Sequence, residues 1–162
     1  MTIRTGNRLP DANLFRLGDS GPEKVRLGEL TKGRKVAIFG VPGAFTPTCS
    51  DQHVPSFVEN RAKLNAKGIE EIICISVNDP FVMKAWGEST GATEAGILML
   101  ADANAEFTKS MGLSFTIADA GLIDRASRFS MVVDDGLVVV LNVEDAPGTC
   151  DATRGESILG QF

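Results

Sequence analysis

Three short apolar runs, each followed by a segment with helical features, constrain the fold of this chain more than any other pattern. The runs are Lys35–Phe39, Ile72–Val77 and Ile97–Leu100. Apolar residues recur at helical spacing from Val54 to Leu64, after the first run. Helices over Phe81–Glu88 and Ala105–Met111 are expected after the second and third runs. Because parallel neighbouring strands need a long crossover, this order predicts a parallel sheet core.

Prolines near two of these segments refine the expected helix starts. Asn78-Asp79-Pro80 resembles an N-cap followed by proline at the first helical position. Pro55 lies early in the helix that follows the first run, where it removes one backbone N–H donor. We therefore expect that helix to be kinked, or its first turn to be separate.

The last third of the chain predicts an antiparallel addition to the parallel core. Arg128–Val133 and Leu137–Val143 are rich in β-branched residues and flank an Asp-Asp-Gly turn. A helix over Thr153–Phe162, capped by Asp151, is expected to follow. The predicted fold is α/β and thioredoxin-like: a central mixed β-sheet flanked by helices, with a C-terminal hairpin and helix, in one domain over residues 1–162.

Composition excludes several classes of function. The chain has 162 residues, 43% hydrophobic and 23% charged, which is ordinary for a globular domain. Its net charge of −5 argues against a nucleic-acid or anionic-membrane surface. No apolar run approaches the roughly 20 residues that span a bilayer. The first residues lack the apolar core of a secretion signal, so we expect a soluble, cytoplasmic protein.

The cysteines indicate free thiols rather than a disulfide framework. There are three, Cys49, Cys74 and Cys150, and none forms a C-x-x-C pair. Together with the single histidine, His53, their spacing does not fit the usual zinc sites, so we expect no structural metal.

Cys49 has the context of an activated thiol. It ends the segment Pro42-Gly43-Ala44-Phe45-Thr46-Pro47-Thr48-Cys49, directly after a predicted strand and where a helix begins. Free backbone N–H groups at such a position favour a thiolate over a thiol. Thr46 places a hydroxyl three residues before the sulfur.

Other candidate residues have simpler interpretations beside a functional one. Cys74 lies within an apolar strand and fits a buried core thiol, whereas Cys150 lies in a polar loop that we expect to be exposed. His53, four residues after Cys49, is expected to be a partly exposed polar side chain near the pocket; the alternative is a general base for the thiol. Arg125 is expected to be a solvated or secondary cation, and Trp86 a core or interface residue.

Three segments carry a family resemblance. Residues 40–49 resemble the peroxiredoxin motif Pro-x-x-x-Thr-x-x-Cys, in the form typical of the type II or peroxiredoxin-5 branch. Ile75–Val82 and Arg128–Gly136 are similar to the same branch, in the same order. The resemblance covers most of the chain, from about Leu30 to about Glu144.

The resemblance implies a role for each matching residue. Cys49 would be the peroxidatic cysteine, and Arg128 would hold its thiolate and polarise the O–O bond. Thr46 would hydrogen-bond the thiolate and the peroxide, while Pro42 would shield the pocket from water. Gly43 would allow the tight loop that presents the Cys49 N–H to substrate. Cys150, or alternatively Cys74, would be the resolving cysteine.

The implied function is that of a thiol-dependent peroxidase for hydrogen peroxide and alkyl hydroperoxides, acting through a cysteine sulfenic acid. It needs no metal, haem or flavin, and thioredoxin or glutaredoxin with glutathione would restore the thiol. A homodimer is typical of the branch. Two alternatives stay open: a peroxide sensor on the same fold that does not turn over, and a Cys-His thiol hydrolase that uses His53.

Overall fold

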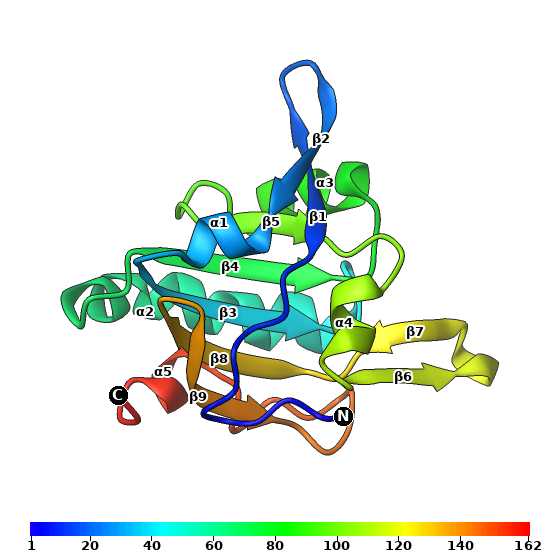
Figure 1. Cartoon of the computed structure of the whole chain (residues 1–162). Helices are drawn as coiled ribbons and strands as arrows, with labels where there is room; N and C mark the ends of the chain where they lie inside the picture. The colour runs from blue at the N-terminus through cyan, green and yellow to red at the C-terminus, as the bar shows by residue number, and fades with distance from the viewer.

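A computed structural model describes residues 1–162, and a seven-stranded sheet forms its centre (Figure 1). The strand order is β2-β1-β5-β4-β3-β8-β9. The strands of this sheet are β1 (Asn13–Gly18), β2 (Gly21–Arg26), β3 (Lys35–Val41), β4 (Glu71–Ser76), β5 (Leu98–Ala101), β8 (Phe129–Asp134) and β9 (Leu137–Val143).

The predicted parallel core and antiparallel hairpin are both confirmed. β3, β4 and β5 pair in parallel, while β8 pairs antiparallel with β3 and β9 antiparallel with β8. The β8–β9 turn has positive φ at Asp135 (47°) and Gly136 (79°), as a two-residue hairpin turn requires. The mixed sheet agrees with the predicted thioredoxin-like fold.

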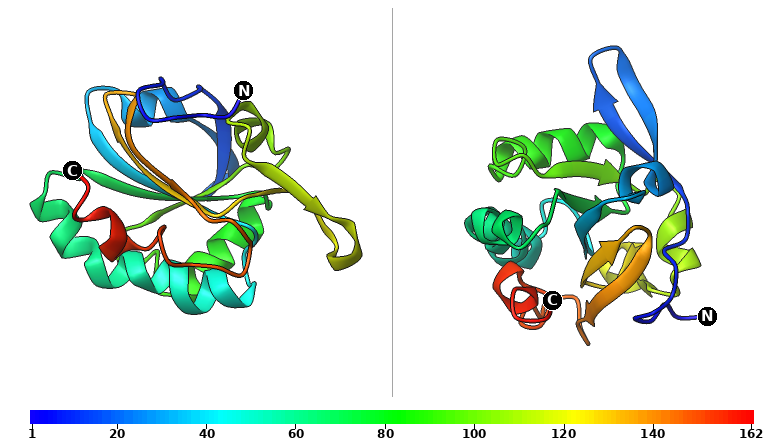
Figure 2. Two further views of the ribbon diagram at one scale, coloured as in Figure 1. Left: turned by 90° about the horizontal axis from the view of Figure 1, so that it is seen from below. Right: turned by 60° about the vertical axis from the view of Figure 1, so that its left-hand side comes forward.

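Helices cover both faces of the sheet (Figure 2). One face packs against α2 (Val54–Ala66), α3 (Pro80–Ser89) and α5 (Gly155–Ile158), through buried side chains such as Phe57, Trp86 and Ile158. The other face is covered by α1 (Leu27–Thr31) and α4 (Glu106–Ser110), through Leu27 and Phe107. No helix is long and apolar enough to cross a membrane.

Two hairpins were not expected from the sequence. β1 and β2 form one, and β6 (Ser114–Ile117) with β7 (Leu122–Ala126) forms a separate two-stranded sheet, joined by the short 3-10 helix η2 (Ala118–Ala120). Both project from the body of the molecule (Figure 1). Their side chains are mostly exposed or half-buried, so neither shows a strong apolar alternation.

The helix after Cys49 begins irregularly, as Pro55 predicts. Cys49–His53 form a π-helical turn, η1, in which the Val54 N–H donates to the Cys49 carbonyl. An α-helix through this point would need an N–H at Pro55, which proline lacks. Regular α-helix therefore starts only at Val54.

The C-terminal helix is shorter than predicted. It covers Gly155–Ile158 rather than Thr153–Phe162, and Asp151 does not cap it. The Thr153 hydroxyl and backbone N–H donate instead to Glu144, which keeps this residue outside the helix. Gly155 lies so close to α2 that an added Cβ would come within 2.5 Å of the Ser56 carbonyl oxygen.

Candidate active site

Cys49 lies at the carboxyl end of β3, after a loop that several side chains hold in place. The loop residue Phe45 adopts a positive φ of 65°. Within the loop, the Thr46 hydroxyl donates to the Gly43 carbonyl at 2.7 Å. The Ala44 N–H donates to Asn78 Oδ1 at 3.0 Å, which ties the loop to the end of β4. Cys49 itself is fully buried, so the surrounding contacts fix the position of its sulfur.

Arg128 is the cation beside the Cys49 sulfur. Its side chain is 1% exposed, and Nη2 donates to Cys49 Sγ at 3.2 Å. Nη2 also donates to the Pro147 carbonyl at 2.8 Å. No ion pair of the chain includes Arg128. A buried cation is costly without an anion, and the Cys49 sulfur is the side-chain atom of an ionisable acid that lies against this guanidinium.

His53 is buried rather than partly exposed, which corrects the sequence expectation. Its Nε2 lies 3.0 Å from the Thr153 carbonyl, which can only accept, so Nε2 carries the proton. Nδ1 is then free to accept from Arg128 Nη1, also at 3.0 Å. Burial and, second, the Arg128 charge lower the pKa of His53 to about 3, so the ring is neutral at pH 7.

This geometry argues against His53 as a base for the thiol. Its Nδ1 contacts Arg128 and its Nε2 contacts a backbone carbonyl, so neither nitrogen is available to Cys49. His53 instead orients the guanidinium that lies against the sulfur. The Cys-His hydrolase alternative loses its structural basis here.

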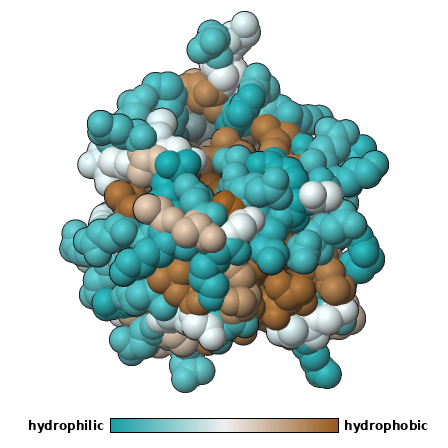
Figure 3. All heavy atoms as spheres, turned by 90° about the vertical axis from the view of Figure 1, so that its left-hand side faces the viewer, coloured by the Kyte–Doolittle hydropathy of each residue, from teal (hydrophilic) through white to brown (hydrophobic).

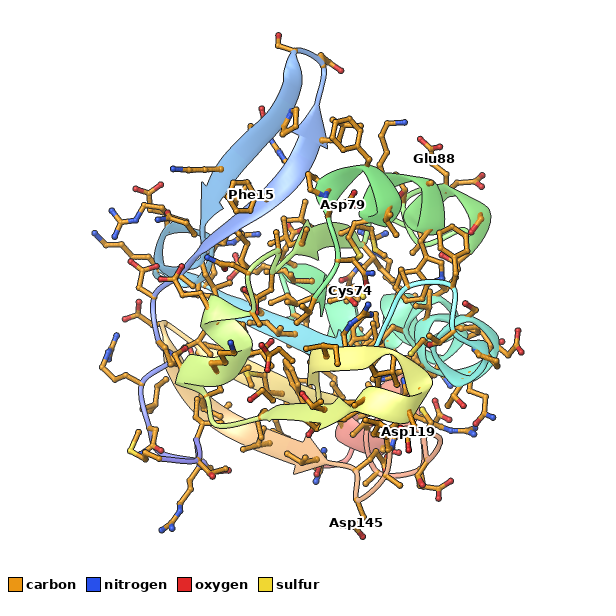
Figure 4. The ribbon with its side chains drawn as sticks, turned by 90° about the vertical axis from the view of Figure 1, so that its right-hand side faces the viewer. Phe15, Cys74, Asp79, Glu88, Asp119 and Asp145 are labelled. Atoms are coloured by element: carbon orange, nitrogen blue, oxygen red, sulfur yellow. The ribbon has the colours of Figure 1, made fainter.

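A small cavity opens beside Arg128 and the Cys49 loop. It has a volume of about 320 Å³ and borders the Cys49 loop, the β6–β7 connection and the segment after β9. Its lining residues are Pro42, Thr46, Pro47, Thr48, Ala120, Leu122, Arg128, Pro147 and Gly148. Figure 4 views this side of the molecule, with Asp119 in the β6–β7 connection. The cavity therefore brings together the predicted residues Pro42, Thr46 and Arg128.

Two further predicted residues lie beside the cavity. Arg125 is half-buried and donates through Nη1 to the Pro42 carbonyl at 3.2 Å, which fits a secondary cation. A Cβ at Gly43 would come within 2.8 Å of that Nη1, so a larger residue at position 43 would displace the end of the Arg125 side chain. The Thr46 hydroxyl hydrogen points to Gly43, and its expected hydrogen bond to Cys49 is not formed.

The other two cysteines are both buried. Cys74 lies in β4, opposite Phe39 of β3, as expected for a core thiol. Burial raises the pKa of this thiol well above the usual value. Cys150 is only 3% exposed, contrary to the expected exposed loop. Burial raises its pKa as well, and its Sγ lies 3.9 Å from Thr153 Oγ1. All three thiols are unpaired.

The sequence analysis did not predict the role of several residues that position the site. Asn78, singled out only as a helix cap, accepts from the Cys49 loop and from the Ser76 hydroxyl. Trp86 donates through Nε1 to Ser50 Oγ at 2.9 Å and so fixes η1. Glu144 accepts three hydrogen bonds from the segment that carries Cys150. In the sequence, Asn78 was notable only as part of a predicted helix cap and of the segment Ile75–Val82, and Glu144 only as the end of the region of resemblance.

Known proteins resemble this chain over nearly its whole length. The profile of the Redoxin family matches residues 4–159. Peroxiredoxin-2E-2, chloroplastic, from Oryza sativa subsp. japonica is 46% identical over 98% of this chain and 72% of its own length. Peroxiredoxin-2B from Arabidopsis thaliana is 45% identical over 97% of this chain and 96% of its own length.

A solved structure extends the agreement to three dimensions. Reduced Prx3 from Vibrio vulnificus, in complex with H2O2, superposes with a TM-score of 0.91 at 45% identity, over 98% of each chain. The identity extends over nearly the whole chain, well beyond the segments that first carried the resemblance. The chain therefore belongs to the Redoxin family and, within it, to the type II peroxiredoxins, which are thiol-dependent peroxidases.

Proposed function

We propose that Cys49 is the peroxidatic residue and that it reduces hydrogen peroxide and alkyl hydroperoxides. The observation that carries this proposal is the 3.2 Å contact between Arg128 Nη2 and Cys49 Sγ, inside the protein and without a competing carboxylate. The Vibrio vulnificus relative was crystallised with H2O2, which supports a peroxide as substrate.

In the proposed reaction the Cys49 thiolate attacks the terminal peroxide oxygen. An S–O bond forms as the O–O bond breaks, leaving a sulfenic acid on Cys49 and an alkoxide or hydroxide that takes up a proton. Arg128 stabilises the charge that develops on the leaving oxygen. Thr46 orients the peroxide and Pro42 limits the entry of water; both line the 320 Å³ cavity.

Recycling of the sulfenic acid requires a second thiol. We assign this role to Cys150, because its segment packs against η1 through Arg154 Nη2 and Gln52 Oε1, 2.8 Å apart. Cys74 is the alternative, although it lies inside the sheet and burial raises its pKa well above the usual value. Thioredoxin, or glutaredoxin with glutathione, would then reduce the product.

Exposed apolar side chains around the site support a homodimer. Phe45 and Phe81 are each 58% exposed, and Ile117 and Ile123 are exposed on the β6–β7 hairpin. On the face at the amino ends of the parallel strands, hydrophilic side chains are interspersed with several hydrophobic patches (Figure 3). A second copy that covers these residues would bury them. Phe45→Glu would then shift the molecular mass in solution to that of a monomer, whereas an unchanged dimer mass would exclude this surface.

The cytoplasm remains the proposed compartment. Three unpaired thiols fit a reducing environment. Relatives carry chloroplastic and mitochondrial names, so an organelle is the competing location. Fluorescence imaging of the tagged protein in its own cells separates the two.

Continuous peroxide consumption tests the proposed function. With each reductant in turn, the wild-type chain should turn over many times and Cys49→Ser not at all. A matched Cys74→Ser change should leave consumption measurable. Retained turnover in Cys49→Ser would refute the assignment, and oxidation of Cys49 without repeated turnover would favour the sensor.

A further inference from the structure

One carboxylate oxygen accepts several hydrogen bonds from the segment that carries Cys150. Glu144 Oε1 accepts from the Asp151 N–H at 2.7 Å and from both the N–H and the hydroxyl of Thr153, each at 3.0 Å. Glu144 follows the last residue of β9, so these bonds close residues 144–153 into a loop. Hydrogen bonds to a charged acceptor are stronger than those between neutral groups. Glu144 is thus one of the charged anchors of this loop, together with Arg154, whose Nε donates to the Cys150 carbonyl, and Arg128, which donates to the Pro147 carbonyl.

The closed loop keeps Cys150 away from solvent. Cys150 is 3% exposed, and Thr153 Oγ1 is the one hydrogen-bonding partner of its sulfur. A disulfide requires the two sulfurs to come within about 2.05 Å. Both are free thiols here, so the segment that carries Cys150 must move at least far enough for the two sulfurs to reach bonding distance.

We infer that Glu144 is a positioning residue that keeps Cys150 buried and unreactive until Cys49 has been oxidised. The inference rests on the proposed function for its use of Cys150. When the loop opens, the Cys150 thiolate attacks the sulfur of the Cys49 sulfenic acid. The S–S bond forms as the S–O bond breaks, and the hydroxide leaves as water with the proton that Cys150 released.

The contacts of Arg128 explain why the loop would open only after Cys49 has been oxidised. Two of its acceptors depend on the loop: the Pro147 carbonyl directly, and His53, whose Nε2–H is bound to the Thr153 carbonyl. Its third partner is the Cys49 sulfur. Oxidation converts the thiolate into a neutral sulfenic acid, which removes the anion from this network. The loop then loses part of what keeps it closed, while the three bonds to Glu144 remain to be broken.

Alkylation of Cys150 in the reduced protein measures the closed loop directly. The protein is treated with N-ethylmaleimide without peroxide, and the modified cysteine is identified by peptide mass mapping. We expect Glu144→Ala to raise the alkylation rate of Cys150 at least tenfold. The matched control is Asp145→Ala, since Asp145 is the next carboxylate, is exposed, and points away from the body of the protein (Figure 4). The control should stay within about twofold of wild type.

Equal rates in the two variants would overturn the inference. If Glu144→Ala fails to fold, Glu144→Gln still tests it, because its amide oxygen keeps an acceptor without the charge and should give an intermediate rate. Hydrogen exchange of the unmodified protein adds a readout without substitution. The amides of Asp151 and Thr153 should be protected, and exchange at the rate of a free peptide would contradict the closed loop.

Treatment with one equivalent of peroxide then tests whether Glu144 controls the reaction of Cys150 with oxidised Cys49. The Cys49–Cys150 disulfide should form faster in Glu144→Ala than in Asp145→Ala, with less overoxidation of Cys49 to sulfinic acid. If Cys49 is oxidised but no such disulfide forms in any variant, the inference fails and the peroxidatic role of Cys49 stands. If Cys49 is not oxidised at all, the proposed function itself fails.

Discussion

The Cys49 loop and the Cys150 segment both carry a buried thiol, but they hold it in opposite ways. Cys49 lies against a guanidinium, with Nη2 of Arg128 3.2 Å from its sulfur. Cys150 has only a hydroxyl within hydrogen-bonding range, and burial raises its pKa. In the proposed reaction Cys49 reacts in place, whereas Cys150 reacts only after its segment moves. Burial is common to both thiols, so the proposal distinguishes them by the neighbouring charge.

The largest expected effect comes from removing that charge. Arg128→Ala should lower the second-order rate constant with hydrogen peroxide by about 10²- to 10³-fold, the usual loss for one donor to a developing oxyanion. Stopped-flow fluorescence measures this rate. Arg125→Ala is the matched control, because Arg125 donates only to the Pro42 carbonyl, and its loss should be much smaller. Equal losses would mean that general positive charge, rather than the Arg128 contact, activates Cys49.

A second change loosens the Cys49 loop without touching the charge. Asn78→Ala leaves the Ala44 N–H without its acceptor, which should cost about 1–3 kcal/mol of unfolding free energy. Urea unfolding measures this cost, and the peroxide rate should fall as the loop becomes less ordered. A variant with the lost stability but the wild-type rate would show that the loop need not be rigid.

The buried histidine that orients Arg128 should also make stability depend on pH. The unfolded chain binds a proton at His53 near pH 6.5, and the folded chain only near pH 3. Its contribution is thus fully present above pH 6.5 and is lost as the pH falls toward 3, by about 1.4 kcal/mol per pH unit.

Comparison of wild type with His53→Gln isolates this contribution. By pH 5 the wild type should have lost about 2 kcal/mol more than the variant, relative to pH 7. Urea midpoints at the two pH values measure the difference. Parallel losses in both proteins would indicate that His53 is accessible to protons in the folded state.

The smallest effect concerns the Cys150 segment. Thr153→Val removes one of the three donors to Glu144 and should cost about 1 kcal/mol, while the reaction of Cys49 with peroxide stays close to wild type. The rate of Cys49 oxidation, followed together with the unfolding free energy, would separate the two regions. A large fall in the peroxide rate would show that they are not independent.

The sequence predicted the parts of this molecule that depend on local pattern. The parallel strands β3, β4 and β5 and the β8–β9 hairpin followed from apolar runs and an Asp-Gly turn. Pro42, Thr46, Cys49 and Arg128 were expected together from the resemblance. The exposed hairpin β1–β2 carried too little apolar alternation to be recognised.

What the sequence could not predict depends on contacts between distant segments. Burial of His53 follows from its bonds to Arg128, 75 residues away, and Thr153, 100 residues away. Burial of Cys150 follows from a polar loop folded back by Glu144, whereas polar composition alone indicates exposure. The same bonds to Thr153 shortened the expected C-terminal helix.

Direct detection of the oxidised sulfur tests the central claim most sharply. The reduced protein is treated with one equivalent of hydrogen peroxide in the presence of dimedone, which traps sulfenic acids, and the labelled cysteine is mapped by mass spectrometry. The account predicts a label on Cys49, formed much more slowly in Arg128→Ala. A label on Cys74 or Cys150 instead of Cys49, or equally fast labelling in the two proteins, would contradict it.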